Sequence, residues 1–352
     1  MRIIVATTHT IPAYSGGWTT PLDLFGEDHQ SMYVIRNYLP VERRIEGIKV
    51  AGTGAVGFLK EPWQQGEKYR IGLVRWMFRR SLQRHFRKFR ADFVLCLDPG
   101  AGYAAMESGL PYAMRFHSKL IAEHLGDNFE ELLKKALFNI SGPTTGADGI
   151  EELPHNQDLA RFSYMESPKP ERAILLTSID DVHEPELFVR GVMLSKSMKG
   201  DIVGTGPDRR KIEALCRETG GRVRCLKPVP RLQVPELLKN YQVGVATVKK
   251  ISDEVYQMKV NAYMASGLFT LAKPWTHIAK EAPELIGTFI TAEDLARWLD
   301  HLQTNWMETL PVIRKAREWI LENYSVEIPR RRFKEILNEK VVPLKLDQSA
   351  NS

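Results

Sequence analysis

The chain has 352 residues, of which 43% are hydrophobic, and its formal net charge is +6 at pH 7. This length suits two domains of ordinary size, each able to bury its own core. Its apolar runs fall far short of the roughly 20 residues that span a bilayer, and residues 1–6 indicate a first strand rather than a signal peptide. Three scattered cysteines without CxxC spacing argue against a disulfide framework and a zinc site. We therefore expect a cytoplasmic protein.

Short apolar segments alternate with helical ones from the first residue onward, which is typical of a parallel α/β architecture. The strands predicted in the first half are 2–7, 47–51, 93–97, 112–116 and 150–153. Gly16 and Gly17 follow the first of these strands, and a Gly-Gly turn lets backbone N–H groups approach an anionic or hydroxylated ligand. Residues 52–57 match the GxGxxG spacing of a dinucleotide-binding turn, but no amphipathic helix follows them. We expect a loop there.

Residues 70–90 carry many basic side chains and no acidic one. Apolar positions recur at helical spacing, so the segment is predicted to be a basic amphipathic helix. These positions are Ile71, Val74, Phe78, Leu82, Phe86 and Phe89, with Trp76 on the flank. The basic face can be a solvated surface, or it can contact an anionic membrane at the inner membrane face or a phosphate-bearing acceptor. Nucleic acid is not expected as a partner, because most of the aromatic residues face the core.

A polar stretch with two prolines, residues 163–172, separates the first set of strands from a second set. The strands predicted beyond it are 173–177, 201–203, 224–226, 243–246, 269–272 and 288–290. The predicted helices are 208–218, 293–304, 312–323 and 328–338. In a doubly wound domain of this kind, ligands bind at the carboxyl ends of the strands.

These boundaries predict two domains. We expect an N-terminal domain over 1–165, a linker over 166–172 and a second domain over 173–323. A further helical segment, 324–340, and a frayed tail, 341–352, complete the chain.

Residues 201–267 carry the most specific pattern in the sequence. A strand ends in Gly204-Thr205-Gly206 and opens a helix, a second strand precedes the prolines of residues 226–230, and a later helix ends at Gly267. This succession resembles the C-terminal, donor-binding half of retaining glycosyltransferases of family 4, which have the GT-B fold. Residues 154–162 and 316–337 are similar to further segments of the same family, so the resemblance covers nearly the whole chain.

The resemblance implies an α/β protein with two Rossmann-like doubly wound domains and an interdomain cleft. It implies transfer of a sugar from a nucleotide-activated donor, with retention of configuration. The N-terminal domain would bind the acceptor, and the C-terminal domain would bind the donor. A glycan, a lipid-linked molecule and a small molecule all stay open as acceptors.

Particular residues take roles by the same resemblance. Gly16 and Gly17 would lie against donor phosphate or acceptor, and Gly204 and Gly206 would let the donor approach their turn. His117 would reach the transferred sugar.

The segment after residue 226 resembles the one whose backbone binds the nucleotide base, so Lys227 and Val229 would line the base site. Glu254 holds the first position of the family's paired-glutamate motif and would contact sugar hydroxyls. Lys259 would contact phosphate.

Three positions depart from the family's pattern. Ala262 replaces the second glutamate of the pair, which holds the ribose hydroxyls. The family's clamp, Gly-Arg-Leu-x-x-x-Lys-Gly, neutralises the leaving diphosphate, but Ser178 stands at its Arg position and His183 at its Lys position. Because leaving-group stabilisation is the main electrostatic task of such a transfer, we expect other cations to compensate. The candidates are Lys249, Lys250 and Lys259, although the first two can also belong to a solvated loop.

The sequence contains no DxD motif, so we expect chemistry without a metal and without a cofactor other than the nucleotide-sugar substrate. The three departures leave one alternative open. In it, the chain is a non-catalytic GT-B homologue that binds a glycan or supports a partner glycosyltransferase.

Overall fold

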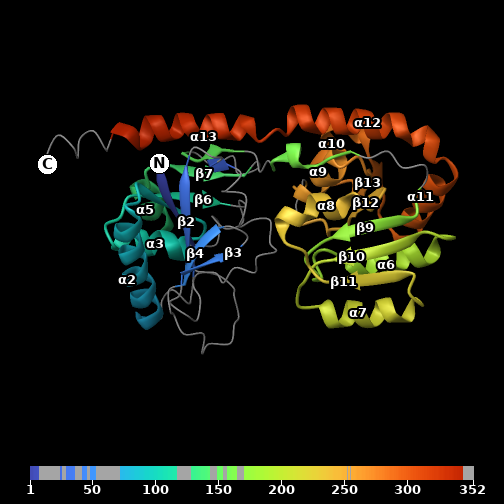
Figure 1. The fold of residues 1–352 in the computed structure, drawn as a ribbon, viewed down its shortest axis with the longest axis horizontal. Helices are drawn as coiled ribbons and strands as arrows, with labels where there is room; N and C mark the ends of the chain where they lie inside the picture. The colour runs from blue at the N-terminus through green and yellow to red at the C-terminus, as the bar shows by residue number, and fades with distance from the viewer. Residues whose placement is uncertain are drawn as a thin grey trace. The chain divides into compact units, whose positions relative to one another are not determined.

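The structure is a computed structural model. It describes residues 1–7, 24–25, 29–35, 42–45, 48–52, 72–116, 128–142, 149–153, 157–164, 170–251, 253 and 255–343. The chain divides into two compact units (Figure 1). Unit 1 comprises Met1–His155 and Val326–Ser352, and unit 2 comprises Asn156–Ser325. Each unit is built on one sheet of mostly parallel strands.

The sheet of unit 1 has the order β3-β4-β2-β1-β5-β6-β7-β8. Its strands are β1 (Arg2–Thr7), β2 (Gln30–Ile35), β3 (Glu42–Ile45), β4 (Ile48–Gly52), β5 (Phe93–Cys96), β6 (Tyr112–Phe116), β7 (Asn139–Ser141) and β8 (Glu151–Glu152). Neighbouring strands are parallel except for β3 and β4. The five predicted strands are confirmed, whereas β2, β3 and β7 are absent from the prediction. β3 is charged and β7 has three residues, so neither shows the apolar run of a central strand.

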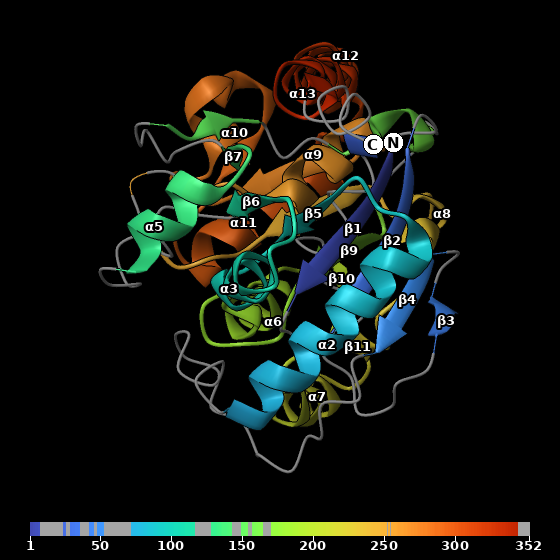
Figure 2. The same cartoon turned by 90° about the vertical axis from the view of Figure 1, so that its left-hand side faces the viewer.

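Helices cover both faces of this sheet (Figure 2). On one face lie α2 (Gly72–Phe89), α3 (Pro99–Glu107) and α5 (Asn128–Lys135). The predicted basic helix is therefore confirmed as α2, and it buries Phe78 and Leu82. The other face is covered by α13 (Glu327–Lys340), whose Phe333 contacts Phe25 and Phe138. The C-terminal helix thus belongs to the core of unit 1.

The sheet of unit 2 is parallel throughout and has the order β11-β10-β9-β12-β13-β14. Its strands are β9 (Arg172–Leu176), β10 (Lys199–Val203), β11 (Val223–Leu226), β12 (Val243–Ala246), β13 (Phe269–Ala272) and β14 (Gly287–Thr288). All six coincide with the predicted strands to within two residues. They are recognisable because strands covered on both faces are apolar along most of their length.

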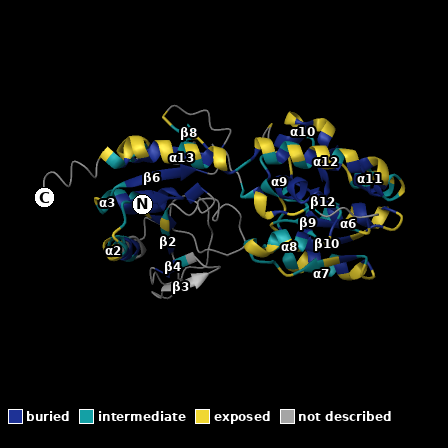
Figure 3. Cartoon of the chain, turned by 45° about the horizontal axis from the view of Figure 1, so that its top comes forward, coloured by how far each residue is buried: buried dark blue, intermediate teal, exposed yellow. Residues whose placement is uncertain are grey.

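The two faces of this sheet bury separate cores. One is formed with α6 (Pro185–Leu194), α7 (Arg209–Glu218) and α11 (Ala292–Thr304), and the other with α8 (Val234–Leu238), α9 (Met258–Ala265) and α10 (His277–Glu281). Residues of α12 (Trp306–Asn323) enter both cores. Single turns of 3₁₀-helix occur at Leu159–Arg161, Arg231–Gln233 and Pro283–Leu285. Burial follows this layering, with exposed residues on the outer sides of the helices (Figure 3).

Residues 157–164 belong to unit 2, although the boundary expected from the sequence assigned them to the N-terminal domain. Leu159 and Phe162 are buried in a core that also contains Tyr263. Tyr164 lies against Gly267, where an added Cβ would come within 1.9 Å of the Tyr164 ring. These contacts explain the grouping.

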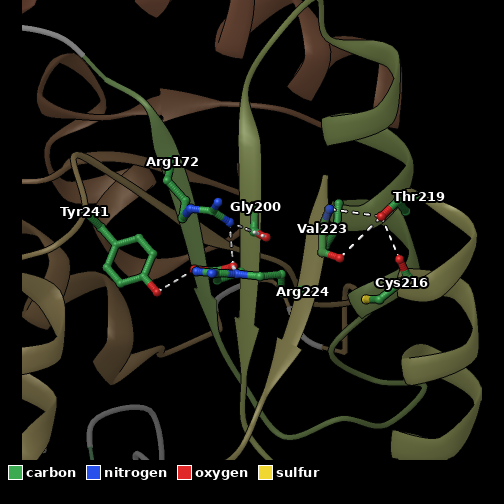
Figure 4. Close-up of polar contacts among 8 residues, drawn as sticks. Arg172, Gly200, Cys216, Thr219, Val223, Arg224 and Tyr241 are labelled. Carbon is green, nitrogen blue, oxygen red and sulfur yellow. Dashed lines mark hydrogen bonds and ion pairs between the residues drawn. The ribbon is translucent and has the colours of Figure 1, made fainter. Parts of the chain in front are cut away.

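A buried charge joins the three strands at one side of the sheet (Figure 4). Asp201 on β10 is fully buried, and its carboxylate accepts hydrogen bonds from Arg172 on β9 at 2.8 Å and from Arg224 on β11 at 2.6 and 2.8 Å. The Tyr241 hydroxyl donates to it at 2.8 Å. Burial raises the pKa of this carboxyl, but the hydrogen bonds and charges of its partners outweigh burial and hold the pKa below its usual range.

We expect Asp201→Ala to lower the free energy of unfolding by about 3 kcal/mol, because it leaves the partners of a buried carboxylate without their counter-charge. Urea denaturation at pH 7 measures the loss. Since the folded pKa is depressed, this contribution is present above about pH 4, the pKa of the unfolded chain, and is lost as the pH falls further. Glu218→Ala, at an exposed position on α7, is the control and should change stability by less than about 0.5 kcal/mol. A loss under about 1 kcal/mol for Asp201→Ala would contradict the assigned role.

Candidate functional site

The candidate site lies at the carboxyl edge of the unit 2 sheet, where the segments after β9, β10, β11 and β12 begin. Ligands of doubly wound sheets bind at this edge. Of the predicted site residues, Gly16, Gly17, His117 and Glu254 lie outside the described residues. The remaining five, Gly204, Gly206, Lys227, Val229 and Lys259, all belong to this edge of unit 2.

The turn after β10 packs backbone to backbone against the segment after β9. The Ile179 N–H donates to the Thr205 carbonyl at 2.9 Å. A Cβ added at Gly204 would lie 1.8 Å from the Thr177 carbonyl oxygen, and one at Gly206 would lie 2.2 Å from the Ile179 carbonyl oxygen. Both positions therefore require glycine for the packing of two loops, whether or not a ligand approaches. Their contact with a donor stays a prediction.

Arg209, at the start of α7, links the segments that follow β10 and β11. No role was predicted for it from the sequence. Its guanidinium donates to the Gly204 carbonyl and, at 3.1 Å, to the Leu226 carbonyl. It thereby joins the ends of β10 and β11. In the segment after Leu226, Lys227 is exposed and Val229 packs on the core. The predicted base-binding segment therefore begins directly after the Leu226 carbonyl that Arg209 contacts. An arginine in a first helical turn is ordinarily solvated, so no sequence pattern indicates this role.

The segment between β9 and α6 keeps a left-handed turn at the place of the clamp's last glycine. Glu184 occupies that place with φ 44° and ψ 50°. Such a conformation is unusual for a residue with a side chain. The Glu184 carboxylate lies 3.5 Å from the Lys273 amino group, and buried Lys273 also donates to the Ile290 carbonyl at 2.7 Å. This ion pair holds Glu184 in a backbone conformation that glycine adopts more readily.

The two clamp positions themselves carry no cation at pH 7. Ser178 is exposed and uncharged. The His183 ring lies with Nδ1 2.7 Å from the Asp180 carboxylate, which also accepts the His183 backbone N–H at 3.0 Å. Burial, together with the nearby charge of Lys259, lowers the pKa of His183 below its ordinary value. The imidazole is therefore mostly neutral at pH 7.

Three lysines were candidates to compensate, and the structure separates them. Lys249 is exposed and lies 2.5 Å from the Asp181 carboxylate, and Lys250 is exposed and lies 3.2 Å from Asp253. Lys259, the second residue of α9, is half-buried, and its amino group donates to the Thr177 hydroxyl at 3.1 Å. Within the described part of the chain it forms no ion pair.

Burial lowers the pKa of Lys259 to about 7, and among the described residues the charge of Asp180 opposes this effect. Lys259 is thus a desolvated cation directed at the segment after β9. This is the segment that carries the clamp positions.

The remaining side chains of α9 serve the core. Ala262 is buried, and its methyl side chain offers no carboxylate to a ribose. Asn261 is fully buried, and its amide contacts the Tyr256 hydroxyl at 3.1 Å and His277 Nε2 at 2.9 Å. Burial lowers the pKa of His277 to about 3, so the ring is neutral. It can donate from Nε2 while Nδ1 accepts the Gln257 N–H at 3.3 Å. Asn261 therefore belongs to a buried network.

Over the described ranges, no cluster of three His, Cys, Asp or Glu side chains has the arrangement of a metal site. In the same part of the chain, no helix combines the length and apolar character needed to cross a membrane.

We expect Lys259→Met to raise the free energy of unfolding by about 1–2 kcal/mol at pH 6.5, allowing for partial exposure, because it removes a desolvated charge. The folded pKa lies below that of the unfolded chain, so the unfolded state binds more protons between about pH 7 and pH 10. The destabilisation by Lys259 is fully present below pH 7 and is lost as the pH rises through this window. Urea denaturation at pH 6.5 and 9.5 measures both values.

The control is Lys249→Met, which removes an exposed lysine and should change stability far less than Lys259→Met does at either pH. A Lys259→Met protein that is less stable than wild type at pH 6.5, or a difference independent of pH, would show that the amino group is not desolvated.

Comparisons with known proteins place this geometry in a wider setting. No protein-family model matches the sequence, and a search of curated proteins finds no match. Solved structures do match the fold. HepE from Anabaena in complex with UDP-glucose aligns with a TM-score of 0.72 and 12% identity, covering 96% of this chain and 100% of that one.

Two other structures align over similar lengths. Sucrose-phosphate synthase from Thermosynechococcus elongatus has a TM-score of 0.74 and 13% identity, covering 96% of this chain and 98% of that one. The lipopolysaccharide outer core galactosyltransferase WaaB has a TM-score of 0.59 and 15% identity, covering 97% and 100%. These likenesses show that the two parallel α/β units of this chain have the GT-B fold of glycosyltransferases, as the sequence resemblance implies.

Proposed function

We propose that this chain is a glycosyltransferase that moves a sugar from a nucleotide-activated donor to an acceptor, with retention and without a metal. The GT-B fold supports the reaction class, and HepE with this fold has been solved with UDP and with UDP-glucose. The observation that carries the proposal lies in unit 2. Glu184 has a left-handed backbone conformation at the position of the clamp's last glycine, and the desolvated amino group of Lys259 points at the same segment.

The donor would bind at the carboxyl edge of unit 2. Its base would lie along the backbone of Lys227 and Val229, and its phosphates near Lys259 and the turn at Gly204 and Gly206. Glycosyl transfer of this kind needs no cofactor beyond the nucleotide sugar, since the leaving phosphate can accept the proton of the acceptor.

Four residues outside the described part of the chain keep their proposed roles. Gly16 and Gly17 would contact phosphate or acceptor, and His117 and Glu254 would contact the transferred sugar. A glycan, a lipid-linked molecule or a small molecule would be the acceptor.

One observation favours a second candidate function, that of a non-catalytic GT-B homologue that binds a glycan or supports a partner glycosyltransferase. The clamp positions Ser178 and His183 offer no cation at pH 7, and Ala262 offers no carboxylate. This candidate predicts that no nucleotide binds.

A thermal-shift panel of UDP, GDP, ADP, TDP and CMP, each alone and as a nucleotide sugar, separates the two functions. We expect one nucleotide to raise the melting temperature, because saturation at one hundred times Kd stabilises a fold by about 2.7 kcal/mol. The nucleotide sugar of that base should then release its nucleotide when acceptors are added. A panel without any shift would overturn the glycosyltransferase proposal in favour of the non-catalytic one.

We also propose that the outer face of α2 contacts an anionic membrane. Trp76 is 53% exposed, and the Arg80 guanidinium lies 5.3 Å from the centre of its ring. Arg84 and Arg87 are exposed along the same helix. Arg79 is engaged by Glu107 at 3.4 Å, whereas Arg80, Arg84 and Arg87 have no carboxylate partner among the described residues. Arginines beside an exposed tryptophan suit an interface of anionic headgroups.

We expect the triple variant Arg80→Glu, Arg84→Glu, Arg87→Glu to bind vesicles of phosphatidylcholine with 30% phosphatidylglycerol at least a hundredfold more weakly than wild type. Each cation near an anionic surface contributes about 1 kcal/mol, so three of them account for about two decades. Co-sedimentation at 50 and 300 mM salt measures binding, which should weaken with salt.

The control variant Arg210→Glu, Arg217→Glu, Lys315→Glu makes the same charge change at exposed positions of unit 2 and should bind as wild type does. Equal binding by the two variants would rule out α2 as the contact.

A further inference from the structure

We infer that Lys259 has taken over the task of the two missing clamp cations, so that the diphosphate of the donor is neutralised from α9 and not from the segment after β9. This inference rests on the proposed function. It assigns to this chain a binding and leaving-group residue that stands outside the clamp motif.

The amino group of Lys259 lies beside the first of the two clamp positions. Lys259 Nζ lies 3.1 Å from the Thr177 hydroxyl, and Thr177 directly precedes the clamp position Ser178. The charge of Lys259 is also felt by His183, the other clamp position. A cation from α9 therefore reaches the same few residues from which the clamp's own Arg and Lys would act.

Four other cations of this edge, Lys273, Lys249, Lys250 and Arg209, are engaged. Lys273 is bound to the Ile290 carbonyl and to Glu184, where it holds the turn. Lys249 and Lys250 each lie beside an exposed carboxylate. Arg209 is occupied by two carbonyl groups.

The charged and titratable groups described as facing Lys259 are Asp180 and His183. The Asp180 carboxylate contacts the backbone N–H and the ring of His183, and within the described residues it forms no ion pair with Lys259. A desolvated lysine without a counter-ion is unfavourable, and an anionic ligand supplies the missing charge.

The transfer reaction places growing negative charge on the leaving diphosphate. The bond between the anomeric carbon and the diphosphate oxygen breaks, and its electron pair goes to that oxygen. The acceptor oxygen forms a bond to the anomeric carbon, and its proton passes to the leaving diphosphate. Negative charge on the diphosphate thus grows in the transition state. A preorganised cation beside it lowers the barrier as well as the dissociation constant.

The test compares a diphosphate with its nucleoside on the same variants. Isothermal titration with UDP and with uridine, or with the corresponding pair if the panel selects another base, gives Kd for wild type, Lys259→Met and Lys259→Arg. We expect Lys259→Met to weaken the diphosphate 30- to 100-fold and the nucleoside less than twofold. Lys259→Arg should stay within about fivefold of wild type. Turnover of the nucleotide sugar should fall more than binding does.

A second experiment restores the motif. In the Lys259→Met background, Ser178→Arg with His183→Lys returns cations to the clamp positions, beside Asp180 and at an exposed site. We expect diphosphate binding to recover at least tenfold. Because Lys259→Met is expected to be more stable than wild type at neutral pH, loss of binding is not loss of folding, and the melting temperature of each variant checks this.

The outcomes are distinct. Wild type that binds no nucleotide overturns the proposed function and this inference together. If Lys259→Met binds the diphosphate as tightly as wild type does, the inference alone is overturned. Equal weakening of diphosphate and nucleoside shows a merely structural role for Lys259 and also overturns it. Failure of the restored clamp to recover binding shows that the two sets of cations do not act at the same place, which contradicts the exchange of roles.

Discussion

The carboxylate of Asp201 is the contact on which the candidate site depends. It is buried in the middle of β10 and accepts hydrogen bonds from an arginine on each neighbouring strand, so β9, β10 and β11 are held in one register. The turns that follow these strands start from that fixed register. They then pack so closely that glycine is needed at positions 204 and 206. A buried charge within the sheet thereby joins the strands from which that edge begins.

At this edge, the backbone conformation of the turns and the charge of their side chains depend on different residues. Glu184 keeps a left-handed turn through its ion pair with buried Lys273, and Gly204 and Gly206 keep the neighbouring turn. The clamp positions, in contrast, hold an exposed serine and a neutral imidazole. Several contacts hold the backbone of these turns, whereas a cation can be supplied by any element that reaches the same point. The backbone conformation of the loop therefore does not depend on a charged side chain at position 178 or 183.

The sequence predicted the features that depend on local pattern. The six strands of unit 2 carry apolar runs, and the glycines of the β10 turn occur at a recognisable spacing. β3 and β7 were missed because β3 is charged and β7 has only three residues, whereas β2 carries a buried apolar run that could have been recognised. The role of Arg209, the turn at Glu184 and the desolvation of Lys259 depend on residues distant in the chain, such as Lys273 and Thr177. No single-sequence pattern contains that information.

The position of Lys259 lowers the stability of the free protein, and this cost indicates a function for its charge. A methionine of similar length would fill the same space beside Thr177 without the free-energy cost of desolvating an ammonium group. In a folded chain that gained nothing else from this side chain, the charge would be an unfavourable element with no compensation. Strained and desolvated groups concentrate where a protein binds or reacts, since a ligand then supplies the interaction that the free protein lacks. The absence of an ion pair at Lys259 within the described residues, near the left-handed turn at Glu184, is therefore the feature of unit 2 that supports the proposed anionic ligand.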